Sequence, residues 1–283
     1  MIKPVLQGEA FLADVRQAAV EKDRLHLWWL GQSGYLVQWQ QHHLLLDPYL
    51  SDSLTQKYAG TAKPHVRMTE RVVAPEQLNF IQVATSSHNH TDHLDGETLG
   101  PLLQANPNLT LLVSEANRYF AADRLQVSPE RLTGLIEGRP RSFGPFTFQA
   151  VPAAHEALEV DENGHYKFIG LVIRVGPWTL YHSGDTVRYE GMAKRLRQWP
   201  IDLALLPING RDPARGVAGN LSGVEAVELA QAIGARLVIP CHYEMFQFNT
   251  VSPETFIAVA EAVRQPYRLL KCGERYSLAP EPH

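Results

Sequence analysis

The 283-residue sequence predicts a layered α/β fold with mixed sheets, arranged as one domain over residues 1–283. From residue 80 onward, short apolar runs typical of strands alternate with stretches typical of helices, which indicates layered α/β architecture. Before that point three strand-like runs follow one another directly, so the sheets should be mixed and not purely parallel. Hydrophobic residues make up 45% of the chain and charged residues 20%, as in ordinary globular proteins.

The first third of the chain is predicted to contain one helix and three strands. Residues 8–23 place apolar side chains on one side at helical spacing, so we expect an amphipathic helix there. Gly31 and Gly34 mark a turn between the first two strands. The irregular, polar stretch 51–75 is a candidate loop facing the substrate. The three expected strands are 25–30, 35–40 and 43–46.

The remaining two thirds are predicted to alternate strands with helices. Ser222 and Glu225 have the spacing of a capping box and should begin one helix. Pro253 favours the first position of another, which should run to about residue 265. Two further helices are expected over 115–125 and 189–198. The expected strands are 80–85, 109–114, 146–151, 167–175, 179–183, 202–208, 236–240, 269–272 and 275–278.

Charge and composition argue against several classes of protein. The net charge is −4 and no basic run stands out, so we expect no nucleic-acid partner. No apolar stretch approaches the length of a membrane span, and the N-terminus lacks the apolar region of a signal peptide. The only cysteines are Cys241, expected in the core, and Cys272, which excludes a disulfide framework and fits a reducing compartment. We therefore expect a cytoplasmic protein without a membrane partner.

A histidine-rich segment directly after the expected strand 80–85 carries the strongest chemical signal. His88, His90, Asp92 and His93 place three imidazoles and a carboxylate within six residues, and these groups are common ligands of divalent metals. Alternate side chains of an extended segment point the same way, so His88 and His90 can reach one ion together. Asp92 and His93 come later, where the chain turns, and can face a second ion.

Three more candidate ligands each follow an expected strand. They are His155, Asp185 and His242. Loops at strand ends are where layered α/β folds place their functional sites. A single histidine on a loop is more often structural, and a histidine-rich segment can also be a solvated loop that binds nothing. The coincidence of four such segments instead indicates a metal site.

The ordered pattern H-x-H-x-D-H, a later lone histidine, an S-G-D segment and a final histidine after an apolar strand resembles the metallo-β-lactamase superfamily. The resemblance implies a four-layer αββα sandwich with the site on one edge. It also implies two divalent ions per chain, with zinc or manganese expected first and iron also compatible, since no thiolate ligand is present. The implied ligands are His88, His90 and His155 for one ion, Asp92, His93 and His242 for the other, and Asp185 as the bridge.

Four shorter segments are similar to the branch that contains L-ascorbate-6-phosphate lactonase. They are Trp29–Gly34, Asp47–Asp52, Tyr181–Thr186 and Ile239–His242. Superfamily members that are true β-lactamases usually lack the bridging aspartate, so Asp185 points to the general hydrolases. In such a site a water held by both ions would lose a proton near neutral pH and become the nucleophile. Asp92 could orient this hydroxide or shuttle its proton, so Asp92 and Asp185 are the candidate catalytic residues.

Other residues are expected to support the site. Asp47 lies where the family places a carboxylate behind a histidine ligand, although it could instead be a turn-forming residue before Pro48. The loop 209–216 leaves a strand at the ligand edge, and Asn209, Arg211 and Arg215 could bind an anionic substrate there. The alternative for this loop is a solvated surface. Weaker candidates of the same kind are Lys57, Tyr58 and His65, and His182 is expected to be a packed histidine.

The leading function is hydrolysis of a small anionic ester, lactone (such as a sugar-phosphate lactone) or phosphoester. A phosphodiesterase acting on RNA or phospholipid is the main alternative, but the chain shows neither a basic exosite nor an amphipathic membrane anchor. A non-catalytic metal-binding protein would be expected to have lost ligands. A di-iron oxidoreductase would need a flavin domain, for which this chain has no room. A small anionic substrate is the expected partner. The sequence is compatible with a homo-oligomer and does not fix the oligomeric state.

Overall fold

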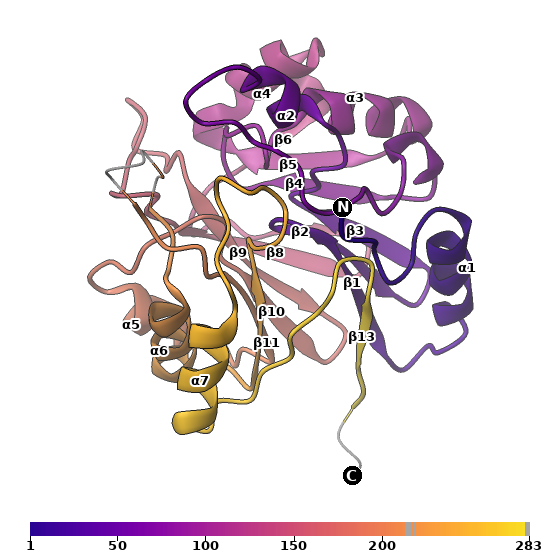
Figure 1. The fold of residues 1–283 in the computed structure, drawn as a ribbon. Coiled ribbons are helices and arrows are strands. Elements are labelled where there is room, and N and C mark those ends of the chain that lie inside the picture. Colours follow the sequence, from indigo (N-terminus) through magenta and orange to yellow (C-terminus); the bar gives the residue numbers. More distant parts are fainter. Residues whose placement is uncertain (213–216, 218, 281–283) are drawn as a thin grey trace.

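The computed structural model describes residues 1–212, 217 and 219–280, and its centre is two β-sheets packed face to face (Figure 1). The seven-stranded sheet has the order β13-β1-β2-β3-β4-β5-β6 and the six-stranded sheet the order β12-β11-β10-β9-β8-β7. In the first sheet the strands are β1 Leu25–Gly31, β2 Gly34–Trp39, β3 His42–Leu46, β4 Val83–Ser86, β5 Thr110–Ser114, β6 Leu132–Leu135 and β13 Arg275–Leu278. In the second they are β7 Arg141–Phe143, β8 Phe146–Pro152, β9 Ile169–Val175, β10 Trp178–His182, β11 Leu203–Pro207 and β12 Leu237–Cys241.

Helices cover the outer faces of both sheets, which makes the predicted four-layer αββα sandwich (Figure 1). On the side of the seven-stranded sheet lie α1 Glu9–Ala18, α2 Ser53–Lys57, α3 Gly96–Ala105 and α4 Arg118–Leu125. On the other side lie α5 Met192–Leu196, α6 Gly223–Ile233 and α7 Glu254–Ala262, with α6 in contact with β11 and β12. Three short 3-10 helices complete the set: η1 Pro75–Gln77, η2 Glu115–Asn117 and η3 Pro129–Arg131.

Both sheets are mixed, as predicted, and their strand directions bring many loops to one edge. Strands β3, β4, β5 and β6 run parallel to one another, and so do β10, β11 and β12. Strand β1 is antiparallel to β2, which is antiparallel to β3, so β1 runs in the same direction as β3. By the same argument through β9, β8 runs in the same direction as β10. The loops that leave β1, β3, β4, β8, β10, β11 and β12 are therefore the ones that can form a common site.

The space between the layers is filled by one large hydrophobic cluster. Every residue of β1 is buried, including Trp28 and Trp29, because this strand has the other sheet on one face and helices on the other. Cys241 and Cys272 are both free and buried, as expected for Cys241. No helix of the described residues is long and apolar enough to cross a membrane.

Several elements differ from the sequence-based expectation. The strand predicted over 269–272 is wrong: this segment makes no ladder, and its neighbour Tyr267 forms only one isolated bridge to Val238 of β12. Helix α1 ends at Ala18, five residues earlier than predicted. Helix α3 was not predicted, because its sequence holds Pro101 and glycines, and tertiary packing against η1 outweighs that poor propensity. The capping box of Ser222 and Glu225 at α6 is confirmed.

Candidate metal centre

The predicted metal ligands all come from loops at the shared edge of the two sheets. The histidine-rich segment follows β4, His155 follows β8, Asp185 follows β10 and His242 follows β12. Backbone geometry at two of these positions is unusual. Gly184 has a φ of +58° and approaches Ser87 so closely that a Cβ atom would lie 2.8 Å from that side chain. His242 also has a positive φ, 67°, and its N–H donates to the Gln32 carbonyl at 3.1 Å. A positive φ at a non-glycine residue such as His242 is a strained conformation of the kind that clusters at functional sites.

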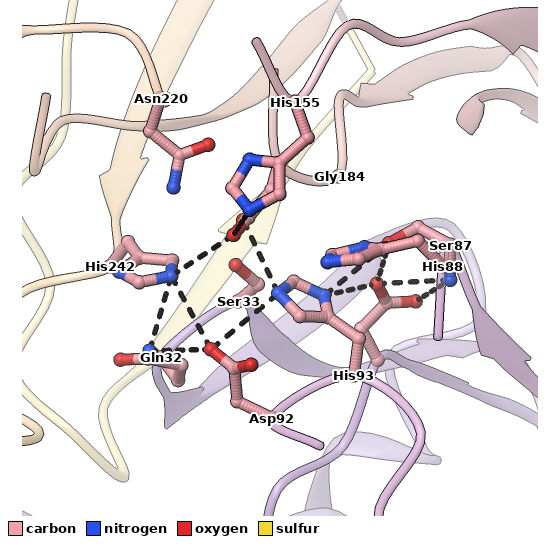
Figure 2. Close-up of polar contacts among 12 residues, drawn as sticks. Gln32, Ser33, Ser87, His88, Asp92, His93, His155, Gly184, Asn220 and His242 are labelled. Atoms are coloured by element: carbon pink, nitrogen blue, oxygen red, sulfur yellow. Dashed lines mark hydrogen bonds and ion pairs between the residues drawn. The ribbon is translucent and has the colours of Figure 1, made fainter. Parts of the chain in front are cut away.

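The structure gathers the seven side chains into two adjacent groups. The first is His88, His90 and His155, and the second is Asp92, His93, Asp185 and His242. Within each group one potential ligand atom per residue lies within 4.8 Å of the others. Figure 2 shows Asp92, His93, His155 and His242 directed toward one another.

Asp185 lies between the two groups. Its Oδ2 is 3.9 Å from His155 Nε2 and 3.4 Å from His242 Nε2, while its Oδ1 is 3.2 Å from His93 Nε2. The carboxylate is therefore near a member of the first group and two members of the second. This is the position that a bridging ligand requires.

Three of the histidines are held from behind, so that each directs Nε2 toward the centre. The Nδ1 atoms of these rings lie 2.7 Å from Asp47 Oδ2 for His93, 3.0 Å from Ser87 Oγ for His88 and 2.7 Å from the Gly219 carbonyl for His155. Metal-binding histidines usually donate their second N–H in this way, which sets the tautomer and the ring orientation.

Asp47 lies where its predicted supporting role requires. Its carboxylate is fully buried at the end of β3 and accepts hydrogen bonds from Thr85 Oγ1 at 2.8 Å and from the N–H and Oγ of Ser87. Burial alone would raise the pKa of Asp47, but the hydrogen bond from His93 and the nearby His182 outweigh it and lower the pKa. The side chain is therefore an anion beside a candidate ligand. His182 is packed and buried, as expected, with Nε2 3.0 Å from the Ser33 carbonyl.

The donor set fits divalent cations. His88 Nε2 is buried and has no hydrogen-bond partner among the described residues, while His93 Nε2 and Asp185 Oδ1 form no regular hydrogen bond but face each other at 3.2 Å as an ion pair. Buried polar atoms without partners are rare and call for an explanation, and a bound cation supplies one. Burial lowers the pKa of His88 well below its ordinary value, so this ring is neutral, as metal coordination needs. Burial would also lower the pKa of His93 and of His242, but Asp185 and Asp92 raise the pKa of His93 well above its ordinary value and that of His242 to about 9, so a cation would have to displace a proton from these two rings. Burial would raise the pKa of Asp185, but His93 and His242 hold it well below its usual range.

Gln32 is a further member of the site that the sequence analysis missed. Its side chain lies in the turn after β1 and donates from Nε2 to Asp92 Oδ2 at 2.8 Å, with His242 Nε2 at 3.1 Å (Figure 2). His242 Nε2 also lies 3.4 Å from Asp185 Oδ2 and 3.5 Å from Asp92 Oδ2. The glutamine amide therefore lies beside the edge of the ring that would face a cation. A hint was present in the sequence, since Gln32 lies between two glycines in the turn.

A cavity of about 220 Å³ opens onto the two groups. Its walls include candidate ligands, three cationic side chains, asparagines and aromatic rings. The cationic side chains are Lys57, Lys63 and Arg124. The described lining residues also include Gln32, Tyr58, His65, Asn89, His90, Asp92, His155, Asp185, Asn220, His242, Phe246, Phe248 and Asn249.

The structure places the described part of the loop 209–216 outside the lining of the cavity. Arg211 does not line the cavity; its guanidinium makes two hydrogen bonds, at 3.0 and 3.2 Å, to the Glu225 carboxylate at the start of α6. Asn209 lies behind the wall and contacts Asn220 and Asn249, which do line it. Arg215 lies outside the described residues. Lys57, Tyr58 and His65, weaker candidates from the sequence, do line the cavity.

Comparison with known proteins agrees with this geometry. The family model of the beta-lactamase superfamily domain matches residues 42–243, which include every candidate ligand. A UPF0173 metal-dependent hydrolase from Alkaliphilus metalliredigens is 30% identical over 234 residues, covering 81% of this chain and 89% of the relative. A second, from Desulforamulus reducens, is 26% identical over 255 residues, covering 88% and 98%.

Solved structures share the fold at low sequence identity. An isothiocyanate hydrolase from Delia radicum gut bacteria superimposes with a TM-score of 0.70 at 18% identity, covering 90% of this chain and 99% of that one. A metallo-beta-lactamase fold protein from Bacillus subtilis gives 0.65 at 19% identity, covering 90% and 100%. These likenesses concern the fold. The family match and the 30% identical relative show that the chain belongs to the metallo-β-lactamase superfamily, in the family of UPF0173 metal-dependent hydrolases.

Proposed function

We propose that this protein hydrolyses a small anionic ester, lactone or phosphoester, using two divalent ions held by the two groups of side chains. His88, His90 and His155 would hold one ion, Asp92, His93 and His242 the other, and Asp185 would bridge them. The donor set contains only imidazole and carboxylate groups, which favours zinc or manganese and also admits iron. When bound, such ions supply Lewis-acid activation of a water and of the scissile group.

The protein's own residues would orient the reaction. Asp92 lines the cavity, and its carboxylate, held by Gln32, can accept a hydrogen bond from an attacking water. Arg124 has a supporting role, because its Nη1 donates to the carbonyls of Asn89 at 2.6 Å and Leu94 at 3.1 Å. These bonds pin both ends of the histidine-rich segment. The guanidinium thus keeps the candidate ligands in place.

The proposal that the substrate is an anion rests on the position of two lysines. Lys57 and Lys63 line the same cavity as Asp92 and Asp185, so two lysine side chains border a candidate metal site that itself attracts anions. The volume of about 220 Å³ is below the roughly 300–1,000 Å³ of pockets for drug-sized ligands. A small substrate fits better than a polymer or a lipid, which favours this function over the phosphodiesterase alternative.

The test compares charged and neutral substrates of one reaction class on zinc- or manganese-loaded protein. Pairs of aryl esters and lactones with and without a carboxylate are assayed on wild type, Lys57→Met and Lys63→Met. Because charge-assisted contacts at exposed sites are modest, each variant should lose roughly tenfold in kcat/KM on the charged substrate and little on the neutral one. Lys22→Met, exposed and outside the cavity, is the matched control.

Two results would contradict the proposal. Hydrolysis that persists in verifiably metal-free protein would contradict the role proposed for the ions. Equal losses on charged and neutral substrates would show that the lysines support the loop and do not bind the substrate. A bis(4-nitrophenyl) phosphate assay run alongside measures phosphodiesterase activity directly.

A further inference from the structure

Four aromatic rings that are not candidate metal ligands line the cavity next to one another. They are Tyr58, His65, Phe246 and Phe248, which we call the aromatic wall. His65 is its centre: its ring stacks on Tyr58 with centroids 4.4 Å apart and a 26° interplanar angle. The same ring lies 5.2 Å from Phe246, edge to face, and 5.4 Å from Phe248. His65 therefore links the other three rings, and all four line the same cavity as the candidate metal ligands.

The aromatic wall is built on two segments that are far apart in sequence but joined through their backbones. Met68 N–H donates to the Met245 carbonyl at 2.8 Å, and Gln247 N–H donates to the Val66 carbonyl at 2.9 Å. Between these bonds Arg67 and Phe246 form an antiparallel bridge. These contacts hold the rings in place before any ligand arrives, which lowers the entropic cost of binding.

Packing against the neighbouring hydrophobic cluster explains the position of Phe246 and, in part, that of Tyr58. Phe246 is fully buried and belongs to a small hydrophobic cluster with Tyr49, Leu54 and Met245, so it anchors the wall. Tyr58, His65 and Phe248 are only partly buried and line the cavity. Burial lowers the pKa of His65 below its ordinary value, so its ring adds no charge near neutral pH. Three partly accessible rings therefore line a cavity whose other lining residues are mostly polar, apart from Leu54, Val217 and the anchoring Phe246.

Building on the function proposed above, we propose that the aromatic wall is a subsite for a planar apolar group of the substrate. The substrate class is then a small anion that carries an aromatic or conjugated ring next to the bond that is hydrolysed. Rings bind ring faces and edges through complementary quadrupoles as well as through burial of apolar area. Lys57 and Lys63, neighbours of Tyr58 and His65 along the chain, place positive charge at the same wall.

The experiment measures binding and does not depend on turnover. Phenylphosphonate and methylphosphonate are titrated into zinc-loaded protein by calorimetry, because both present the same anion to the metals and differ only in the ring. Wild type should bind phenylphosphonate about tenfold or more tightly, given the combined contributions of ring contact and burial. Phe248→Ala should reduce this preference to about threefold or less while its affinity for methylphosphonate stays unchanged.

Two further variants make the result specific. Phe248→Leu keeps an apolar side chain of similar size without a ring, so it should lose most of the preference even if the alanine variant folds poorly. Tyr119→Ala, which removes an exposed aromatic ring of α4 outside the cavity, should leave the preference intact. Equal affinity of wild type for the two phosphonates would overturn the subsite, as would a full preference in Phe248→Leu.

The two proposals fail separately. If no metal-dependent hydrolysis is found but the phenyl preference depends on Phe248, the subsite stands and the proposed function falls. If metal-dependent hydrolysis of anions is found without any phenyl preference, the aromatic wall is structural and the proposed function stands.

Discussion

Replacing Asp47 with Asn is expected to weaken metal binding without unfolding the protein. The buried carboxylate accepts hydrogen bonds from Thr85 Oγ1 at 2.8 Å and Ser87 N–H at 3.1 Å, and lies 2.7 Å from His93 Nδ1. Asn keeps the shape, but its NH2 group cannot accept a hydrogen bond and its charge is zero. His93 would lose either its orientation or its anionic partner.

The magnitude follows from the contact between Asp47 and His93. Hydrogen-bond partners of metal-binding histidines are typically worth 10–100-fold in metal affinity, about 1.4–2.8 kcal/mol. Asp47 also accepts from two other residues, so the variant should lose stability, by about 1–3 kcal/mol for each donor left without an acceptor. Zinc titration in competition with a chelating dye measures the affinity, and urea unfolding measures the stability.

Asp95→Asn is the matched control. Asp95 is also a buried carboxylate, and it accepts a hydrogen bond from Ser53 Oγ at 2.8 Å, but it belongs to neither group of candidate ligands. This variant should lose stability and keep its zinc affinity. Wild-type affinity in Asp47→Asn, or an equal loss in Asp95→Asn, would refute the reasoning.

Three further predictions concern metal removal, Gln32 and acid stability. Chelation should lower Tm reversibly, because each site at 100 Kd of free ion contributes about 2.7 kcal/mol to the folded state; an unchanged melting curve would contradict a bound ion. Gln32→Leu removes the amide next to Asp92 and His242, so the metal-free protein should lose roughly 1.5–3 kcal/mol and gain more in Tm on zinc binding than wild type does. Burial lowers the pKa of His43 to about 4, so on acidification the imidazole takes up a proton in the unfolded chain before it does so in the folded protein. The free energy of unfolding should therefore fall by roughly 3 kcal/mol as the pH drops from 6.5 to 4. His43→Phe should show a smaller loss between pH 7.5 and 4.5 in urea unfolding, and an identical loss would argue against this titration.

The two groups of candidate metal ligands could be predicted from the sequence because their imidazole and carboxylate side chains lie directly after strands. Imidazoles and carboxylates directly after apolar runs mark both the ligands and the edge on which they meet. The strand directions then bring His155, Asp185 and His242 to the histidine-rich segment. Gln32 was missed because an amide in a turn has no distinctive spacing, and its contacts depend on the position of His242, 210 residues away.

The walls of the cavity could be predicted less well, for two different reasons. Arg211 was assigned to the substrate although a nearer partner was visible in the sequence: Glu225 of the capping box keeps its carboxylate at the start of α6, where it accepts both the Ser222 N–H and the guanidinium. The aromatic wall, by contrast, exists only because residues 66–68 pair with residues 245–247 across the molecule. No local pattern encodes that pairing, since the direction of a loop depends on the surface against which it packs. The groups that we propose to select the substrate therefore lie in the part of the molecule that a single sequence describes least.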